Sequence, residues 1–153
     1  MMRGVPRVPR WLAFAGIAPQ LALAWCAWTG EPQWVEPARV AGGLYAGLIL
    51  SFLGGAWWGI AATAPAAEGR GVLGWVWVAA ATPTLVALAA SLWWLAEPAR
   101  PQPALVTLAF ALLATPLVDR RLAAMVLVPR WWTALRWPPC IAMGLATLAL
   151  AVR

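Results

Sequence analysis

Five runs of apolar residues, separated by short stretches of proline and charged residues, divide the chain. The runs cover about residues 11–28, 38–63, 72–95, 104–118 and 139–152. A helix rises ~1.5 Å per residue, so about 20 apolar residues cross the ~30 Å core of a bilayer. We therefore predict one all-α domain over residues 1–153, an integral membrane helical bundle with five transmembrane helices.

The first run follows a basic lead-in, which is also the pattern of a cleaved signal peptide. The run is longer than the apolar core of most signal peptides, which is about 7–15 residues. It also contains Pro19 and Gln20, and no clear small-x-small cleavage site follows it. We expect this segment to stay in the chain as the first span.

The last two runs are the shortest, and a basic segment lies between them. Pro116 falls near the end of the fourth run, and two prolines at 138–139 open the fifth, because proline fits the first turn of a helix. The segment from Asp119 to Trp137 mixes arginine with tryptophan, which is typical of an interfacial segment in the headgroup layer. We expect Asp119 to pair with Arg120. The candidate lipid-headgroup ligands are Arg120, Arg121, Arg130 and Arg136.

Small residues recur at every fourth position of the second run, where they would let another helix approach closely inside a bilayer. This candidate helix-packing seam contains Gly43, Gly47, Ser51, Gly54, Gly55 and Gly59. The alternative is that the small residues leave a groove for a flat apolar ligand. The candidate ligand-binding residues, which are the buried amide and the deeper or seam-facing tryptophans, are Gln20, Trp25, Trp57 and Trp58.

Composition supports a membrane location. Hydrophobic residues make up 63% of the 153 residues and charged residues only 10%, whereas soluble domains carry roughly 25% charged residues. The net charge of +6 comes from arginines in the short connecting stretches, which indicates an anionic lipid surface rather than nucleic acid. Most of the 13 tryptophans lie near predicted span ends, where indole rings anchor at the interface.

The distribution of arginines predicts an orientation. With five spans, the two termini lie on opposite sides of the membrane. A cytoplasmic N-terminus places most arginines inside, namely Arg3, Arg7, Arg10, Arg70, Arg120, Arg121, Arg130 and Arg136, and leaves outside only Arg39, Arg100 and Arg153. The positive-inside rule therefore predicts a bacterial inner (cytoplasmic) membrane protein with a periplasmic C-terminus.

The sequence offers little reactive chemistry. It contains no histidine, and its two cysteines form no metal-binding pattern. No charged residue falls in the middle of a predicted span, which argues against a proton relay or an ion-coupled pump. We expect no metal, cofactor or catalytic residue, and a non-enzymatic role, as an accessory or assembly subunit beside other membrane proteins. The alternative is a binding or transport protein for a flat apolar ligand: a tetrapyrrole, a quinone or a lipid.

Three motifs resemble a known family. They are GIAP at Gly16–Pro19, LILSFLGGAWWG at Leu48–Gly59, and DRRL at Asp119–Leu122 followed by PRWWTALRWP at Pro129–Pro138. In this order they are similar to the transmembrane protein 69 family, a group of small bacterial and mitochondrial membrane proteins. The chain departs from that family at Trp57, where a histidine or another polar residue is usual, and at Gln20, where an apolar residue is usual. The resemblance implies fold and membrane location, and it brings no activity.

Overall fold

The computed structural model describes residues 4–64 and 74–153, and this part of the chain is helical without strands. Its helices are α1 (Arg7–Ala15), α2 (Ala18–Thr29), the short 3₁₀ helix η1 (Pro32–Trp34), α3 (Val35–Thr63), α4 (Gly74–Ala96), α5 (Gln102–Ala124) and α6 (Trp132–Ala151). Five helical segments are long and apolar enough to cross a membrane: Arg7–Thr29, Pro32–Thr63, Gly74–Ala96, Gln102–Ala124 and Trp132–Ala151. The predicted all-α membrane bundle of five spans is confirmed. Arg3, Arg70 and the first two residues of the predicted third span lie outside the described residues.

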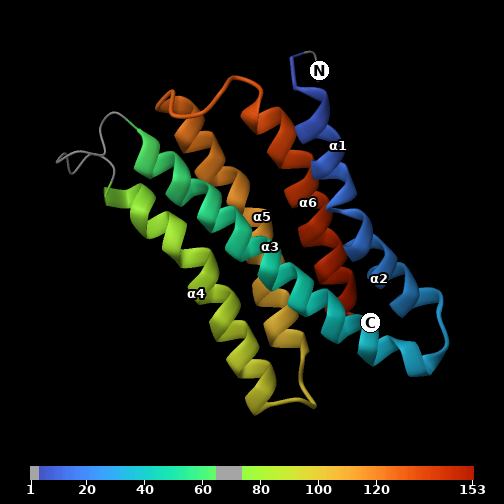
Figure 1. The fold of residues 1–153 in the computed structure, drawn as a ribbon. Helices are drawn as coiled ribbons and strands as arrows, with labels where there is room; N and C mark the ends of the chain where they lie inside the picture. Colours follow the sequence, from blue (N-terminus) through green and yellow to red (C-terminus); the bar gives the residue numbers. More distant parts are fainter. Residues whose placement is uncertain (1–3, 65–73) are drawn as a thin grey trace.

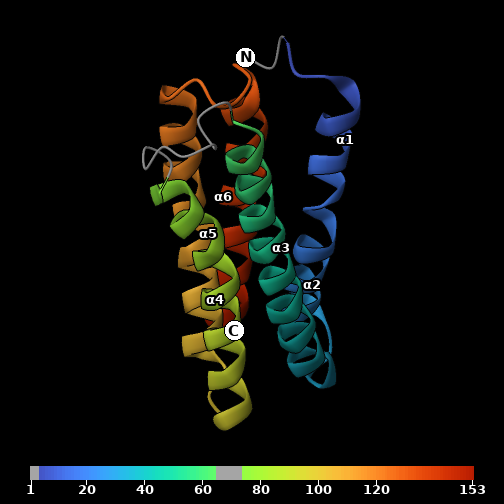
Figure 2. The same ribbon diagram turned by 60° about the vertical axis from the view of Figure 1, so that its left-hand side comes forward.

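Helix α3 lies in the middle of the bundle, where it packs against α2, α4, α5 and α6 (Figure 1). Helices α5 and α6 form the other extensive helix pair. The N-terminus and the C-terminus lie toward opposite ends of the bundle in both views (Figures 1 and 2). The largest buried cluster lies between α3, α4, α5 and α6, and it includes Leu50, Leu53, Leu108, Leu112 and Met143.

The first span is broken into two helices at Gly16 and Ile17. Pro19 is the physical cause, because a proline lacks the N–H that continues the helical ladder and its ring crowds the preceding turn. The hydroxyl of Tyr45, on α3, donates to the carbonyl of Gly16 over 2.6 Å. This bond satisfies a backbone group at the break, as a membrane interior requires.

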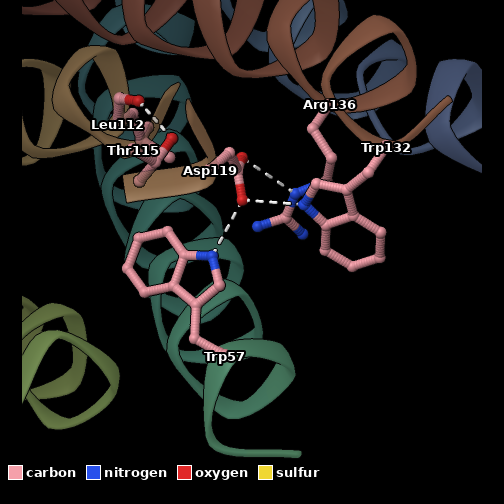
Figure 3. A network of polar contacts seen from close by, with 6 residues as sticks. All are labelled: Trp57, Leu112, Thr115, Asp119, Trp132 and Arg136. Carbon is pink, nitrogen blue, oxygen red and sulfur yellow. Dashed lines mark hydrogen bonds and ion pairs between the residues drawn. The ribbon is translucent and has the colours of Figure 1, made fainter. Parts of the chain in front are cut away.

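The fourth span is longer than predicted. We expected it over 104–118, but α5 runs from Gln102 to Ala124 and contains Pro116. The proline leaves the carbonyl of Leu112 without its usual N–H partner. The Thr115 hydroxyl donates to that carbonyl over 2.7 Å, so the helix continues past the proline (Figure 3).

The fifth span also begins earlier than predicted. Pro138 and Pro139 do not open the helix at 139 but lie inside α6, which starts at Trp132. Its 20 residues, at ~1.5 Å each, reach across a bilayer core. The segment from Asp119 to Trp137 is thus largely helical, and its expected place in the headgroup layer stays a prediction. It consists of the end of α5, a short connection and the start of α6.

Polar side chains tie the C-terminal end of α6 to its neighbours. Arg39 donates from Nε to the carbonyl of Leu150 over 3.1 Å, and Trp28 donates to the carbonyl of Ala149 over 3.0 Å. Arg153 donates to the carbonyl of Ala27 at the same end over 2.9 Å. These cationic and N–H donors thus satisfy backbone carbonyls at the C-terminal ends of α2 and α6, where the helix dipole is negative.

The expected helix-packing seam is only partly used within the chain. A Cβ built on Gly54 would lie 2.4 Å from the carbonyl oxygen of Ala80, and one on Gly43 would lie 2.4 Å from the Trp94 ring. Gly55 and Gly59 differ, because no described atom of another helix lies within 4 Å of a Cβ placed on either. The small residues at every fourth position lie on a helix of about 3.6 residues per turn. The seam therefore rotates by about 40° per step and leaves the α3–α4 interface.

The adjacent glycines Gly54 and Gly55 give a matched test of this packing. Gly54→Leu forces the backbones of α3 and α4 apart, so we expect it to lower the free energy of unfolding in mild detergent by about 1–3 kcal/mol. Gly55→Leu adds the same side chain at an open position, and we expect a change within ~0.5 kcal/mol. Equal losses in the two variants would contradict the packing described here.

Candidate functional site

A buried carboxylate joins three helices at the end of the bundle that holds the N-terminus (Figure 3). Asp119, near the end of α5, is fully buried. Its Oδ1 accepts hydrogen bonds from the indole Nε1 of Trp57 on α3 and of Trp132 on α6, each over 2.9 Å. Its Oδ2 accepts from Nε of Arg136 on α6 over 3.3 Å.

The local sequence explains how these donors converge. Trp132 and Arg136 are four residues apart, so they lie on the same face of α6, one turn above the other. Asp119 and Arg136 compensate each other's charge, which a pair of ions removed from water requires. The expected pairing of Asp119 with Arg120 is wrong, because the adjacent Arg120 points to the exposed side of α5. Both residues lie within helices, Asp119 near the end of α5 and Arg136 near the start of α6, so neither falls in the middle of a span.

Arg136 is committed to the bundle interior rather than to lipid headgroups. Only 9% of the residue is exposed, and its guanidinium lies 5.0 Å from the centre of the Trp132 ring. Its Nη2 atom is buried without a hydrogen-bond partner among the described residues. The structure therefore contradicts the expected role of Arg136 as a headgroup ligand. The other three are exposed at the bundle end, and contact of lipid headgroups with them stays a prediction: Arg120, Arg121 and Arg130.

An apolar cavity of about 410 Å³ adjoins Arg136. Its walls come from the α1–α2 segment, from α3 and from α6, and include Leu12, Ala13, Ile17, Ile49, Phe52, Ala56, Trp132, Leu135, Cys140 and Met143. All of the lining residues are described, and Arg136 is the only charged one. Leu12 and Phe52 are each 67% exposed, so the cavity opens toward the lipid-facing surface of the bundle.

The candidate ligand-binding residues do not come together. Trp25 is 72% exposed on the outside of α2, and Trp58 packs edge-to-face on Trp77 with the ring centres 4.8 Å apart. Trp57 is 2% exposed and donates its N–H to Asp119, so it supports the carboxylate network and does not line the cavity. The candidate site made of these tryptophans is therefore wrong as an arrangement.

Gln20 is fully buried between α2 and α6, outside the cavity. Its Nε2 donates to the hydroxyl of Thr147 over 2.8 Å, and that hydroxyl donates to the carbonyl of Met143. Its Oε1 has no hydrogen-bond partner among the described residues. Gln20 thus links α2 to α6 by a hydrogen bond. Nothing in the described residues places it beside Trp25, Trp57 or Trp58, the other candidate ligand-binding residues.

The sequence reasoning missed the two features that make this site. The signal for the network was the pair Trp132 and Arg136, a donor pair at helical spacing that follows an acidic residue. We assigned those residues to an interfacial segment because the prolines at 138–139 suggested that the helix began later. The cavity has no such signal, since its lining residues come from three helices and the break after α1 and are mostly apolar.

Comparison with known proteins identifies the family. A family model described as "Protein of unknown function (DUF3429)" matches residues 5–152. The chain therefore belongs to this family, whose description does not mention transmembrane protein 69. No curated protein and no solved structure matches the chain.

The carboxylate network predicts a large loss on its removal. Asp119→Asn leaves the Arg136 charge uncompensated in the interior, so we expect the free energy of unfolding in detergent to fall by about 3–5 kcal/mol. Trp57→Phe removes one of the two indole donors and should cost about 1–3 kcal/mol.

The ion pair between the exposed Glu36 and the largely buried Arg39 provides the control. Its charged groups are 3.6 Å apart, and the Glu36 side chain is 56% exposed, so we expect Glu36→Gln to cost less than ~1 kcal/mol. A loss in Asp119→Asn no larger than in Glu36→Gln would show that the buried carboxylate does not hold the helices together.

Proposed function

We propose that this member of the DUF3429 family is a non-enzymatic protein of the bacterial inner membrane that binds an apolar small molecule. The observation that carries the proposal is the cavity between α1, α3 and α6. Its volume of about 410 Å³ falls within the ~300–1,000 Å³ of typical ligand sites. Those sites combine apolar walls with a few placed polar groups, and here Arg136 supplies a charged group.

The position of the cavity favours a ligand that arrives from the bilayer. The exposed Leu12 and Phe52 lie at its opening, on a surface made of apolar side chains. Figure 2 shows α1 diverging from α3 toward the end that holds the N-terminus. A molecule dissolved in the lipid can therefore reach the walls without crossing water.

The state of the polar groups supports binding rather than catalysis. Asp119 accepts from three donors, so most of its hydrogen-bonding capacity is committed to structure. Cys140 lines the cavity, and the described residues contain no cluster of histidine, cysteine and carboxylates that could hold a metal. A non-enzymatic role agrees with this arrangement.

Within the DUF3429 family, the motif from Leu48 to Gly59 supports a relationship of this chain to the transmembrane protein 69 family. That motif supplies Gly54, which packs on α4, and it contains Trp57, which donates to Asp119 and is the position at which the chain departs from that family. The similar DRRL and PRWWTALRWP stretches supply Asp119, Trp132 and Arg136. The stretches of resemblance therefore coincide with the contacts that hold α3, α5 and α6 together.

A role as an accessory subunit is the second candidate, and the outer face of α3 favours it. Gly55 and Gly59 have open space beside them, and a groove of about 340 Å³ runs past Gly55, Trp58 and Ala81 between α3 and α4. Small residues on a lipid-facing surface allow a helix of another membrane protein to approach closely.

Mild extraction followed by native mass spectrometry tests the main proposal. We expect wild-type protein from its own membranes to retain one small molecule per chain, because the apolar walls of the cavity bury most of the surface of such a ligand. Ala56→Phe fills the cavity and should abolish this adduct. Ala62→Phe is the matched control, since Ala62 is exposed on the same helix and lies outside the cavity.

The same spectra separate the two candidate functions. A small-molecule adduct that survives in Ala62→Phe and disappears in Ala56→Phe supports ligand binding. A co-purifying membrane protein without an adduct supports the accessory-subunit role. A protein that is alone and empty under conditions that preserve lipid adducts contradicts both.

A reporter fused after Arg153 tests the proposed orientation. The start of α3 and the end of α6, next to Arg39 and Arg153, lie at one end of the bundle (Figure 1). The start of α1, the end of α5 and the start of α6 lie at the other end, and these segments contain or adjoin Arg7, Arg10, Arg120, Arg121 and Arg130. The positive-inside rule then predicts a periplasmic C-terminus, so alkaline phosphatase fused there should be active. A fluorescent protein fused at the same position should be dark, and the reverse pattern would contradict the proposed orientation.

A further inference from the structure

We propose that the ligand of this cavity carries a neutral carbonyl-type hydrogen-bond acceptor, as a quinone or an ester does, and that the guanidinium of Arg136 donates to that group. This inference rests on the proposed function, and it adds the chemical class of the ligand. Its basis is the buried guanidinium and the charge balance around it.

The guanidinium is held with an unused donor. Its Nε donates to Asp119, and its plane lies close to the ring of Trp132. Nη2 is buried and has no partner among the described residues. A buried donor without a partner costs about 1–3 kcal/mol, and more when the group is charged, so an acceptor at this position would be strongly stabilised.

The guanidinium belongs to a residue of the cavity wall. The residue is 9% exposed and forms part of the cavity wall, next to the apolar Trp132, Leu135 and Cys140. Water in so apolar a space would have few other partners, whereas a ligand with a large apolar body can fill the walls and place one acceptor at the guanidinium.

Charge balance decides between a neutral and an anionic acceptor. Asp119 already compensates the charge of Arg136, so the pair is neutral as a unit. A carboxylate or phosphate in the cavity would add an uncompensated buried negative charge, which is costly in an apolar medium. A ketone or ester oxygen accepts the hydrogen bond without changing the net charge.

Three probes with similar apolar chains test this inference on the full chain in lipid nanodiscs. They are a decyl-substituted benzoquinone, decylbenzene and decanoate, and native mass spectrometry measures the occupancy of each. We expect the quinone to bind one per chain and to bind at least about tenfold more tightly than the other two, because only it offers a neutral acceptor. Ala56→Phe should abolish quinone binding, and Ala62→Phe should leave it unchanged.

Arg136→Lys tests the role of the guanidinium. Lysine keeps a positive charge for Asp119 but lacks the forked second nitrogen, so we expect quinone affinity to fall about tenfold while decylbenzene affinity stays the same. Where this variant does not fold, the order of the three probes on the wild-type chain decides the question.

The possible failures are distinguishable. Decylbenzene binding as tightly as the quinone, or an unchanged quinone affinity in Arg136→Lys, overturns the role of the guanidinium and leaves an apolar binding site. Tighter binding of decanoate overturns the neutral class. If none of the three probes shows binding that Ala56→Phe reduces, the proposed function is overturned as well.

Discussion

A carboxylate buried in an apolar bundle must be neutralised and hydrogen-bonded, and the end of this structure that holds the N-terminus depends on how that is done. Asp119 receives its donors from two other helices, α3 and α6, so these helices have to meet α5 at one point. The requirement is strict because neither lipid nor apolar side chains can replace the missing water. A single acidic residue therefore determines where three spans converge.

The cavity follows from the same convergence. Arg136 reaches Asp119 from the α6 side, and the same residue forms part of the wall of the space between α1, α3 and α6. The break at Gly16 and Ile17 lets α1 take a different direction from α2, so α1 lines the cavity without closing it. A structural ion pair and a binding group are thus provided by one guanidinium, which is why the ligand we propose is neutral.

The apolar runs predicted the number of spans correctly because a bilayer imposes their length and composition. The span ends were less predictable, because prolines were read as boundaries. Pro116 does not end α5, since the Thr115 hydroxyl satisfies the carbonyl that the proline leaves free. That contact depends on a rotamer, and spacing alone does not show it. The error moved Asp119 and Arg136 out of the helices, which hid the buried ion pair.

The helix-packing seam of α3 shows the same limit of prediction from sequence spacing. Its small residues predicted close packing, and Gly43 and Gly54 do pack tightly, but Gly55 and Gly59 have rotated out of that interface. Trp57 and Trp58 differ in the same way. One is buried against Asp119 and the other is exposed beside Trp77, although they are adjacent in the sequence. Which of two neighbouring residues faces the core depends on the rotation of the helix, and that is set by contacts far away along the chain.

The most direct test of this account is a double-mutant cycle between Asp119 and Arg136, measured as free energies of unfolding in one detergent. If the two residues form a buried pair, Asp119→Asn and Arg136→Gln should each destabilise the bundle, and the double variant should recover about 2 kcal/mol or more relative to the sum of the single losses. Losses that add within ~0.5 kcal/mol would show that the residues are independent and would contradict the convergence of α3, α5 and α6 on Asp119.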